Sequence, residues 1–166
     1  MDVEVLRAEP ADWETVKQVR LRALADAPHA FGSTLVRECR FDDQQWQRRI
    51  GGGNWFLARS QGRAVGVVAT VVEQDSPDEH HLVAMWVEPA QRGTATASNL
   101  VEAVCRRARA AGASAVTLWV ANGNPRARRF YERLGFHPTN ERKPLPSAPE
   151  VSEERMRRRL PPAHEE

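Results

Sequence analysis

The chain has 166 residues, of which 41% are hydrophobic and 28% charged, and its formal net charge is +2. This length is typical of one domain with a buried core. The balanced charge indicates neither a nucleic-acid nor a membrane partner, and no apolar run approaches the roughly 18 residues of a membrane span. Cys39 and Cys105 have neither metal-ligand nor disulfide-framework spacing, so we expect a cytoplasmic protein without a metal.

Apolar periodicity and turn residues predict an alternation of strands and helices. In chain order we expect a strand at 3–6, helices at 10–24 and 41–50, strands at 55–58, 64–72 and 81–87, a helix at 97–111, a strand at 115–120, a helix at 125–134, a strand from Phe136 and a last strand at 151–160. Residues 144–149 are expected to form a loop. The last strand is expected at a sheet edge, with its arginines facing solvent.

This order of elements predicts one α/β (α+β) domain over residues 1–160, followed by a frayed tail at 161–166. Three antiparallel strands followed by strand–helix–strand–helix indicate a mixed, mostly antiparallel sheet. We expect about six to seven strands, flanked by about four helices on both faces.

The segment from Val87 to Ser98 joins a buried strand to a helix and is rich in small residues. The first N–H groups of a helix have no acceptor within it and can bind an anion. From the residues alone, this segment is either a phosphate-sized anion site on the backbone of residues 93–98 or an ordinary tight turn. It matches neither the dinucleotide fingerprint nor the P-loop pattern.

A second segment, from Asn124 to Phe136, contains the only tyrosine of the chain, Tyr131. Asn124 is expected at a helix N-cap, with Tyr131 two turns later on roughly the same face. A phenol, with a pKa of about 10, can donate a proton to a leaving thiolate, whose thiol has a pKa of about 8.5. Alternatively, Tyr131 is a core aromatic with its hydroxyl at the edge.

Together the two segments resemble the GNAT superfamily of N-acetyltransferases. The first is similar to V-x-P followed by R/Q-x-x-G/A-x-G/A, and the second to N-x-x-A-x-x-x-Y-x-x-x-G-F. The matching residues are Val87, Pro89, Arg92, Ala95, Ala97, Asn124, Ala127, Tyr131, Gly135 and Phe136. The expected order of strands and helices is also similar to that of the family over nearly the whole chain. It implies the GNAT fold, in which two central parallel strands splay apart.

The resemblance further implies direct transfer of an acetyl group from acetyl-CoA to a primary amine. Backbone N–H groups of the turn would hold the diphosphate, strand main chain would pair with the pantetheine, and Tyr131 would protonate the departing thiolate. The cofactor-binding residues so implied are Met85, Trp86, Val87, Arg92, Gly93, Thr94, Ala95, Thr96, Ala97, Ser98 and Asn124.

The turn departs from the family pattern at two pairs of residues. Ala95 and Ala97 replace glycines, which would cost roughly 1–2 kcal/mol wherever φ is positive. Thr94 and Thr96 add hydroxyls that either donate to phosphate or cap the helix.

The general base is a third departure, because the strand at 115–120 lacks the glutamate of many relatives. His81, with a reference pKa near 6.5, is our first candidate for the base, and Glu79 the second. His81 is otherwise an ordinary polar residue at a strand start. We expect Phe31 and Trp119 to line the acceptor pocket, although Trp119 is also compatible with core packing.

The acceptor itself is left open as either a small molecule, such as an amine-bearing metabolite or antibiotic, or a protein amine. A different class of function is also compatible with these residues. It is a CoA-binding module of the same fold that has lost acetyl transfer. Relatives often dimerise, so a homodimer remains a further expectation.

Overall fold

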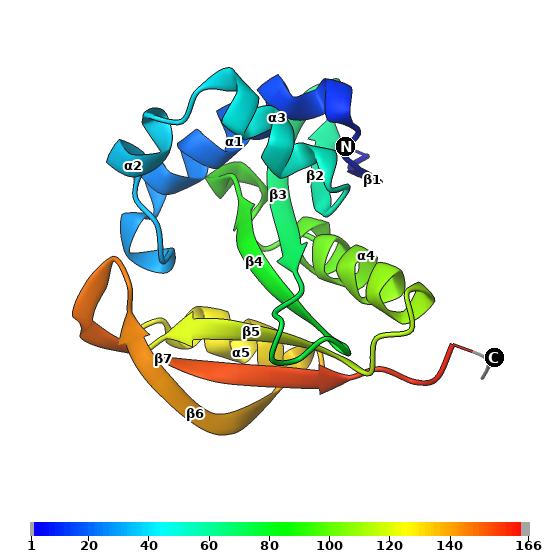
Figure 1. Ribbon diagram of the computed structural model, residues 1–166, viewed down its shortest axis with the longest axis vertical. Helices are drawn as coiled ribbons and strands as arrows, with labels where there is room; N and C mark the ends of the chain where they lie inside the picture. Colours follow the sequence, from blue (N-terminus) through cyan, green and yellow to red (C-terminus); the bar gives the residue numbers. More distant parts are fainter. Residues whose placement is uncertain (1, 164–166) are drawn as a thin grey trace.

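The computed structural model describes residues 2–163 and contains seven strands and five α-helices in that part of the chain (Figure 1). They are β1 (Glu4–Arg7), α1 (Trp13–Asp26), α2 (Leu35–Cys39), α3 (Asp43–Gly51), β2 (Trp55–Ser60), β3 (Arg63–Val71), β4 (Glu79–Val87), α4 (Thr96–Ala110), β5 (Ala115–Ala121), α5 (Pro125–Arg133), β6 (His137–Leu145) and β7 (Ala148–Arg159). Within residues 2–163, no helix combines the length and apolar character that a membrane crossing requires.

The seven strands form one sheet in the order β1-β2-β3-β4-β5-β7-β6. Every neighbouring pair is antiparallel except β4 and β5. Those two strands pair only where residues 79–81 face residues 115–117, and beyond that point they separate (Figure 1). The predicted mixed sheet and its splayed parallel pair are therefore confirmed.

An irregularity in β4 accompanies this separation. Val67 faces Trp86 while Ala69 faces Val83, so β4 has one residue more than β3 between these pairs. Ala84 lies in this bulge with a φ of 59°, which is uncommon for a residue with a side chain. Because a bulge bends and twists its strand, it helps to direct the end of β4 away from β5.

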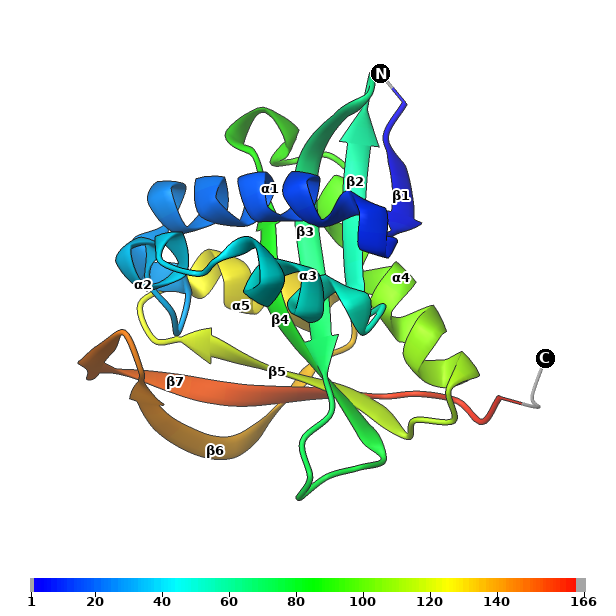
Figure 2. The ribbon, with the colours of Figure 1, turned by 45° about the horizontal axis from the view of Figure 1, so that its top comes forward.

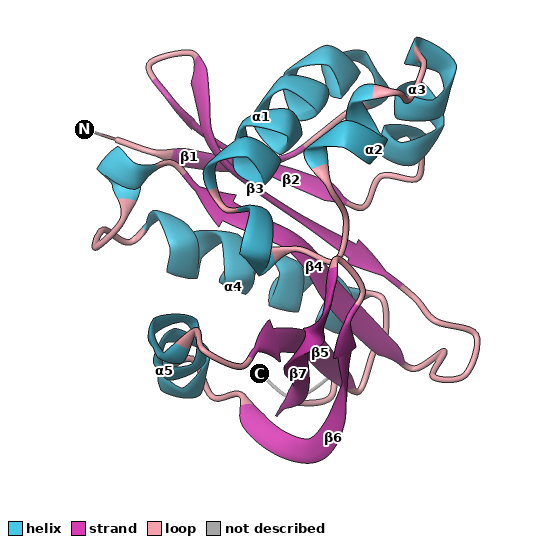
Figure 3. Ribbon diagram, turned by 90° about the vertical axis from the view of Figure 1, so that its left-hand side faces the viewer, coloured by secondary structure: helices cyan, strands magenta, loops and turns pink. Residues whose placement is uncertain are grey.

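Helices cover both faces of the sheet, as the alternation predicted (Figures 2 and 3). On one face, α1 and α3 bury Val16, Trp46 and Ile50 against β2 and β3. On the other, α4 buries Leu100 and Val104 in a core that α5 completes. The spacing of apolar side chains at three and four residues along α1 and α4 is what made these two helices predictable.

Helix α2, from Leu35 to Cys39, was not predicted. It has five residues, too few for an apolar periodicity to be recognised. Its N-cap is Thr34, whose hydroxyl accepts a hydrogen bond from the Arg37 N–H at 3.2 Å. This cap fixes the connection between α1 and α3, which contributes to the candidate site.

The predictions for the C-terminal strands were partly wrong. Strand β7 lies between β5 and β6, so it is not an edge strand, and its Arg155 and Arg158 form ion pairs. The expected loop at 144–149 shrinks to a short turn, since β6 runs to Leu145 and β7 starts at Ala148. Pro138 and Pro144 lie on the true edge strand, β6, where a proline is tolerated, while Pro146 lies in the turn and Pro149 is the second residue of β7.

The expected tail starts beyond β7. Residues 161–163 are exposed, although the carbonyl of Pro162 accepts a hydrogen bond from Arg109 at 3.0 Å. Residues 164–166 of the predicted tail lie outside the described residues.

Candidate active site

A cavity of about 890 Å³ is lined by residues of the helical layer α1–α3 and by the strands from β3 to β7. Phe31, His81 and Trp119, which the sequence analysis proposed separately, all line it. Phe31 comes from the connection after α1, and its carbonyl accepts a hydrogen bond from Ser147 at 2.6 Å. This contact joins the helical wall to the β6–β7 turn, so the cavity is bounded by segments far apart in sequence.

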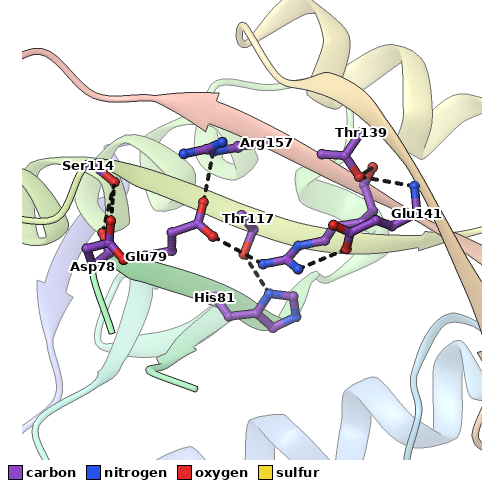
Figure 4. A network of polar contacts seen from close by, with 9 residues as sticks. Asp78, Glu79, His81, Ser114, Thr117, Thr139, Glu141 and Arg157 are labelled. Atoms are coloured by element: carbon purple, nitrogen blue, oxygen red, sulfur yellow. Dashed lines mark hydrogen bonds and ion pairs between the residues drawn. The ribbon is translucent and has the colours of Figure 1, made fainter. Parts of the chain in front are cut away.

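His81 lies on β4, is only 7% exposed, and its Nδ1 is 2.8 Å from Oγ1 of Thr117 on β5. Figure 4 shows the second ring nitrogen pointing away from Thr117. Burial lowers the pKa of His81 to about 4, and the nearby Arg155 and Lys143 act in the same direction, while Glu73 opposes them. The imidazole is therefore neutral at pH 7, with a pKa well below the reference value of the sequence analysis.

Glu79 is not brought to the cavity lining. Its carboxylate is 2.8 Å from Nε of Arg157 and 3.4 Å from Nη2 of Arg155, both on β7 (Figure 4). These two ion pairs hold the carboxylate against β7, outside the cavity lining, so it is not placed to take a proton from a ligand in the cavity. The geometry therefore favours His81 over Glu79 as the base.

Two carboxylates from the sheet side reach the cavity without having been candidate bases. Glu73 follows β3, in the connection to β4. Glu153 lies on β7, is 6% exposed and forms an ion pair with Lys143 at 3.4 Å. Burial raises the pKa of Glu153, and Lys143 partly offsets this. No local signal marks Glu153, because only the pairing of β7 beside β5 places it opposite Ala121.

Tyr131 lies on α5, is 8% exposed and belongs to the core on that face of the sheet. Its ring makes edge contacts with Phe130 and Phe136, at centroid distances of 5.0 and 5.7 Å. Burial raises the pKa of Tyr131 above its ordinary value, so the phenol keeps its proton at neutral pH. The ring of Tyr131 is therefore a core aromatic, as one of the two alternatives predicted. Its protonated hydroxyl can still donate a hydrogen bond.

Asn124 occupies the predicted N-cap of α5. Its side-chain oxygen accepts a hydrogen bond from the N–H of Ala127 at 3.2 Å. The cap fixes the start of the helix that carries Tyr131 two turns later. The side-chain NH₂ of Asn124 remains the group available to a ligand.

The turn before α4 has several unused amides. Gly93 adopts a φ of +81°, a conformation that glycine reaches without steric cost. Among the described residues, the backbone N–H groups of Gly93, Ala95, Ala97 and Ser98 have no backbone acceptor. They precede or begin a helix of 15 residues, whose dipole adds positive potential at this end. The arrangement is therefore suited to an anion.

The substitutions of this turn are accommodated. Ala95 has a φ of −76° and Ala97 lies within α4, so neither methyl group meets the strain of a positive φ. The hydroxyl of Thr94 donates to the carbonyl of Gln91 at 2.6 Å and accepts from the N–H of Thr96 at 3.3 Å. The hydroxyls of Thr94 and Thr96 are thus used within the turn.

Arg92 and Trp86 share one carboxylate on α1. Nη2 of Arg92 and Nε1 of Trp86 lie 2.5 and 3.0 Å from Oδ2 of Asp26. Hydrogen bonds from Trp86 and then Arg92 lower the pKa of Asp26. The Trp86 side chain thus lies on the α1 face, whereas Met85 packs with the opposite core. The main chain of residues 85–87 is therefore available to a ligand that lies between the separated ends of β4 and β5.

Metal-ligand chemistry is not apparent in the described part of the chain. Between residues 2 and 163, no three His, Cys, Asp or Glu side chains come together as a metal site. The two cysteines are unpaired, with Cys39 exposed and Cys105 buried.

A profile of the acetyltransferase (GNAT) family matches residues 19–136. Mycothiol acetyltransferases of Thermobispora bispora and Thermomonospora curvata are 31% and 33% identical over 129 and 135 residues, which cover 75% and 81% of this chain. These matches cover 43% and 44% of the two relatives, so the chain spans less than half the length of the curated proteins it matches.

Solved structures show the same fold. An acetyltransferase of the GNAT family from Streptococcus pneumoniae superposes with a TM-score of 0.82 at 16% identity, covering 96% of this chain and 100% of that one. A Salmonella typhimurium structure with its cofactor acetyl-CoA gives 0.79 at 15% identity, covering 97% and 95%. The chain belongs to the acetyltransferase (GNAT) family, as its motifs predicted.

Proposed function

We propose that this chain is a cytoplasmic, acetyl-CoA-dependent N-acetyltransferase that acts on a primary amine of a small molecule or a protein. The observation that carries the proposal is the turn of unused amides at the end of β4, beside the gap between β4 and β5. The family membership, the names of the curated relatives and the acetyl-CoA in the Salmonella structure support it.

The turn supplies the donors for the cofactor's diphosphate. The amides of Gly93, Ala95, Ala97 and Ser98 donate to its oxygens, and the α4 dipole adds to the attraction. Because Arg92 is already paired with Asp26, its charge contributes less than the backbone does. The threonine hydroxyls hold the turn in shape.

The gap between β4 and β5 receives the pantetheine arm. Beyond residue 81, β4 has no β5 partner, so its main-chain groups on that side are free to pair with an extended ligand. Met85, Trp86 and Val87 supply this main chain, and a backbone N–H among them polarises the thioester carbonyl. Asn124 contributes its side-chain NH₂ to the pantetheine.

The cavity holds the acceptor between Phe31 and Trp119, and its amine attacks the thioester carbonyl. A C–N bond forms and the C–S bond breaks, so the nitrogen must lose one proton and the sulfur must gain one. His81 takes the proton from nitrogen, directly or through water, when its Nδ1–H donates to Thr117 and leaves Nε2 free. With a pKa of about 4, His81 acts most effectively after attack has made the nitrogen acidic.

Tyr131 supplies the proton to sulfur. A phenol is protonated at neutral pH, and burial, by raising the pKa of Tyr131, makes it a weaker acid, so the transfer requires the departing sulfur to lie within hydrogen-bond reach of the hydroxyl; solvent afterwards restores the proton. Phe130 and Phe136 hold the ring in position.

The test combines cofactor binding with turnover. Calorimetry with acetyl-CoA is expected to show binding, and a panel of amines assayed by thiol release is expected to show turnover. Tyr131→Phe should lower kcat by about 10²–10⁴-fold, because proton transfer is lost, and should leave the Kd for acetyl-CoA within about twofold. An unchanged kcat would remove the acid role of Tyr131. Acetyl-CoA binding without turnover of any amine would support the CoA-binding module instead.

A further inference from the structure

The candidate acceptor cavity has an uneven distribution of charge. Its cationic residues are concentrated on the helical layer, with one further cation on β6; they are Arg20, Arg37, Arg48, Arg49 and Lys143. The carboxylates Glu73 and Glu153 come from the sheet side, after β3 and on β7. A third carboxylate, Glu38, lies on the helical side. The way in which Glu38 is paired decides the charge of that wall.

Glu38 is 1% exposed and is shared by two guanidinium groups. Nε and Nη2 of Arg20 donate to its two oxygens at 3.0 and 2.9 Å, and Nη1 of Arg49 donates at 2.9 Å. Burial raises the pKa of Glu38, but the hydrogen bonds and charge of Arg20 outweigh it and the net shift is downward. These three ionised side chains, of which Arg20 and Glu38 are buried and Arg49 is partly exposed, together keep one positive charge.

Arg20 also has an unused donor. It is 6% exposed, and its Nη1 is buried without a hydrogen-bond partner among the described residues. Its Nε and Nη2 are turned toward Glu38, so Nη1 lies on the other side of the guanidinium group. That group stacks on Phe31, another lining residue, at 4.8 Å. Because Nη1 has almost no accessible surface, Arg20 contributes positive charge to the cavity wall and leaves the direct contacts to more exposed side chains.

Two further arginines add to the positive wall. Arg37 on α2 and Arg48 on α3 line the cavity and are exposed. Within residues 2–163, neither side chain forms an ion pair with a carboxylate. Arg37 and Arg48 supply exposed donors for an anion, and Arg20 adds positive charge behind them.

We propose that the acceptor carries a carboxylate as well as its amine, as an amino acid does. The carboxylate binds the helical wall formed by Arg20, Arg37 and Arg48, because the planar guanidinium group matches its two oxygens. The ammonium group faces the sheet side, where Glu73 favours a cation, since Glu153 is already paired with Lys143. This inference rests on the proposed acetyl transfer and narrows its substrate class.

The experiment uses pairs of amino acids and their carboxamides, which share one amine and differ only in the carboxylate. We measure kcat/KM by thiol release and affinity by calorimetry, with and without CoA. The amino acid of each pair should be preferred at least tenfold. The amine of a carboxamide is less basic, so more of it is in the unprotonated, nucleophilic form at neutral pH. Basicity alone would therefore favour the carboxamide, and a preference for the amino acid must come from its carboxylate.

Matched variants assign the preference to the wall. The double substitution Arg37→Gln and Arg48→Gln should reduce the preference to less than threefold and leave the Kd for acetyl-CoA unchanged. Arg40 is exposed and lies outside the cavity lining, so Arg40→Gln should change neither the preference for the amino acid nor the Kd for acetyl-CoA. Carboxamides that bind and react as well as amino acids would overturn the inference while leaving acetyl transfer intact. A preference unaltered in the double variant would also overturn it. Failure to bind acetyl-CoA would instead refute the proposed function, and calorimetry with the free protein would still test the carboxylate site.

Discussion

Replacing His81 by glutamine should change how the stability of this protein responds to acid. The pKa of His81 is lowered from 6.5 to about 4 by burial, so between these values the unfolded chain binds a proton that the folded protein does not. The contribution of the neutral His81 to the free energy of unfolding is fully present above pH 6.5, and it is lost as the pH is lowered toward 4. The difference of about 2.5 pKa units corresponds to about 3 kcal/mol between pH 7 and pH 4.

The assay is urea unfolding of the wild type, His81→Gln and a control at several pH values from 7 to 4. Glutamine does not titrate, so the His81→Gln variant should lose about 3 kcal/mol less than the wild type over this interval. His137→Gln, which replaces an exposed histidine on β6, should follow the wild-type curve. Parallel curves for His81→Gln and the wild type would refute the burial argument and, with it, the neutral imidazole of the mechanism.

Two further substitutions test the cavity wall and the turn. Glu38→Gln removes the charge shared by Arg20 and Arg49 and should lower the free energy of unfolding by about 3 kcal/mol in urea titrations, because two guanidinium groups lose their counter-charge; a loss below about 1 kcal/mol would contradict this. Gly93→Ala strains a φ of +81° and should weaken acetyl-CoA binding about tenfold in calorimetry. Gly112→Ala, at +85° beyond the other end of α4, should cost similar stability of about 1–2 kcal/mol without affecting binding. Equal affinities in the two alanine variants would argue against the turn as the diphosphate site.

Local sequence patterns were sufficient to predict most of the helices and strands. Helix α4 was predictable because Leu100 and Val104 lie one turn apart on one face, and Gly112 ends the segment. The order of elements then restricted the sheet to a mixed arrangement, and the Asn124–Phe136 motif indicated the family. Five-residue α2 escaped because one turn and a half offers no periodicity to detect.

The sequence by itself determined most of the elements, the family and the residues of the turn, because these depend on neighbours within a few positions. Only the tertiary structure decided that β7 enters the sheet between β5 and β6, which places Glu153 in the cavity. It also decided that Glu79 is held by two arginines while His81 is buried and neutral. Pairing and burial depend on contacts between segments distant in sequence, and pKa values follow burial and charge, so no local pattern could have supplied them.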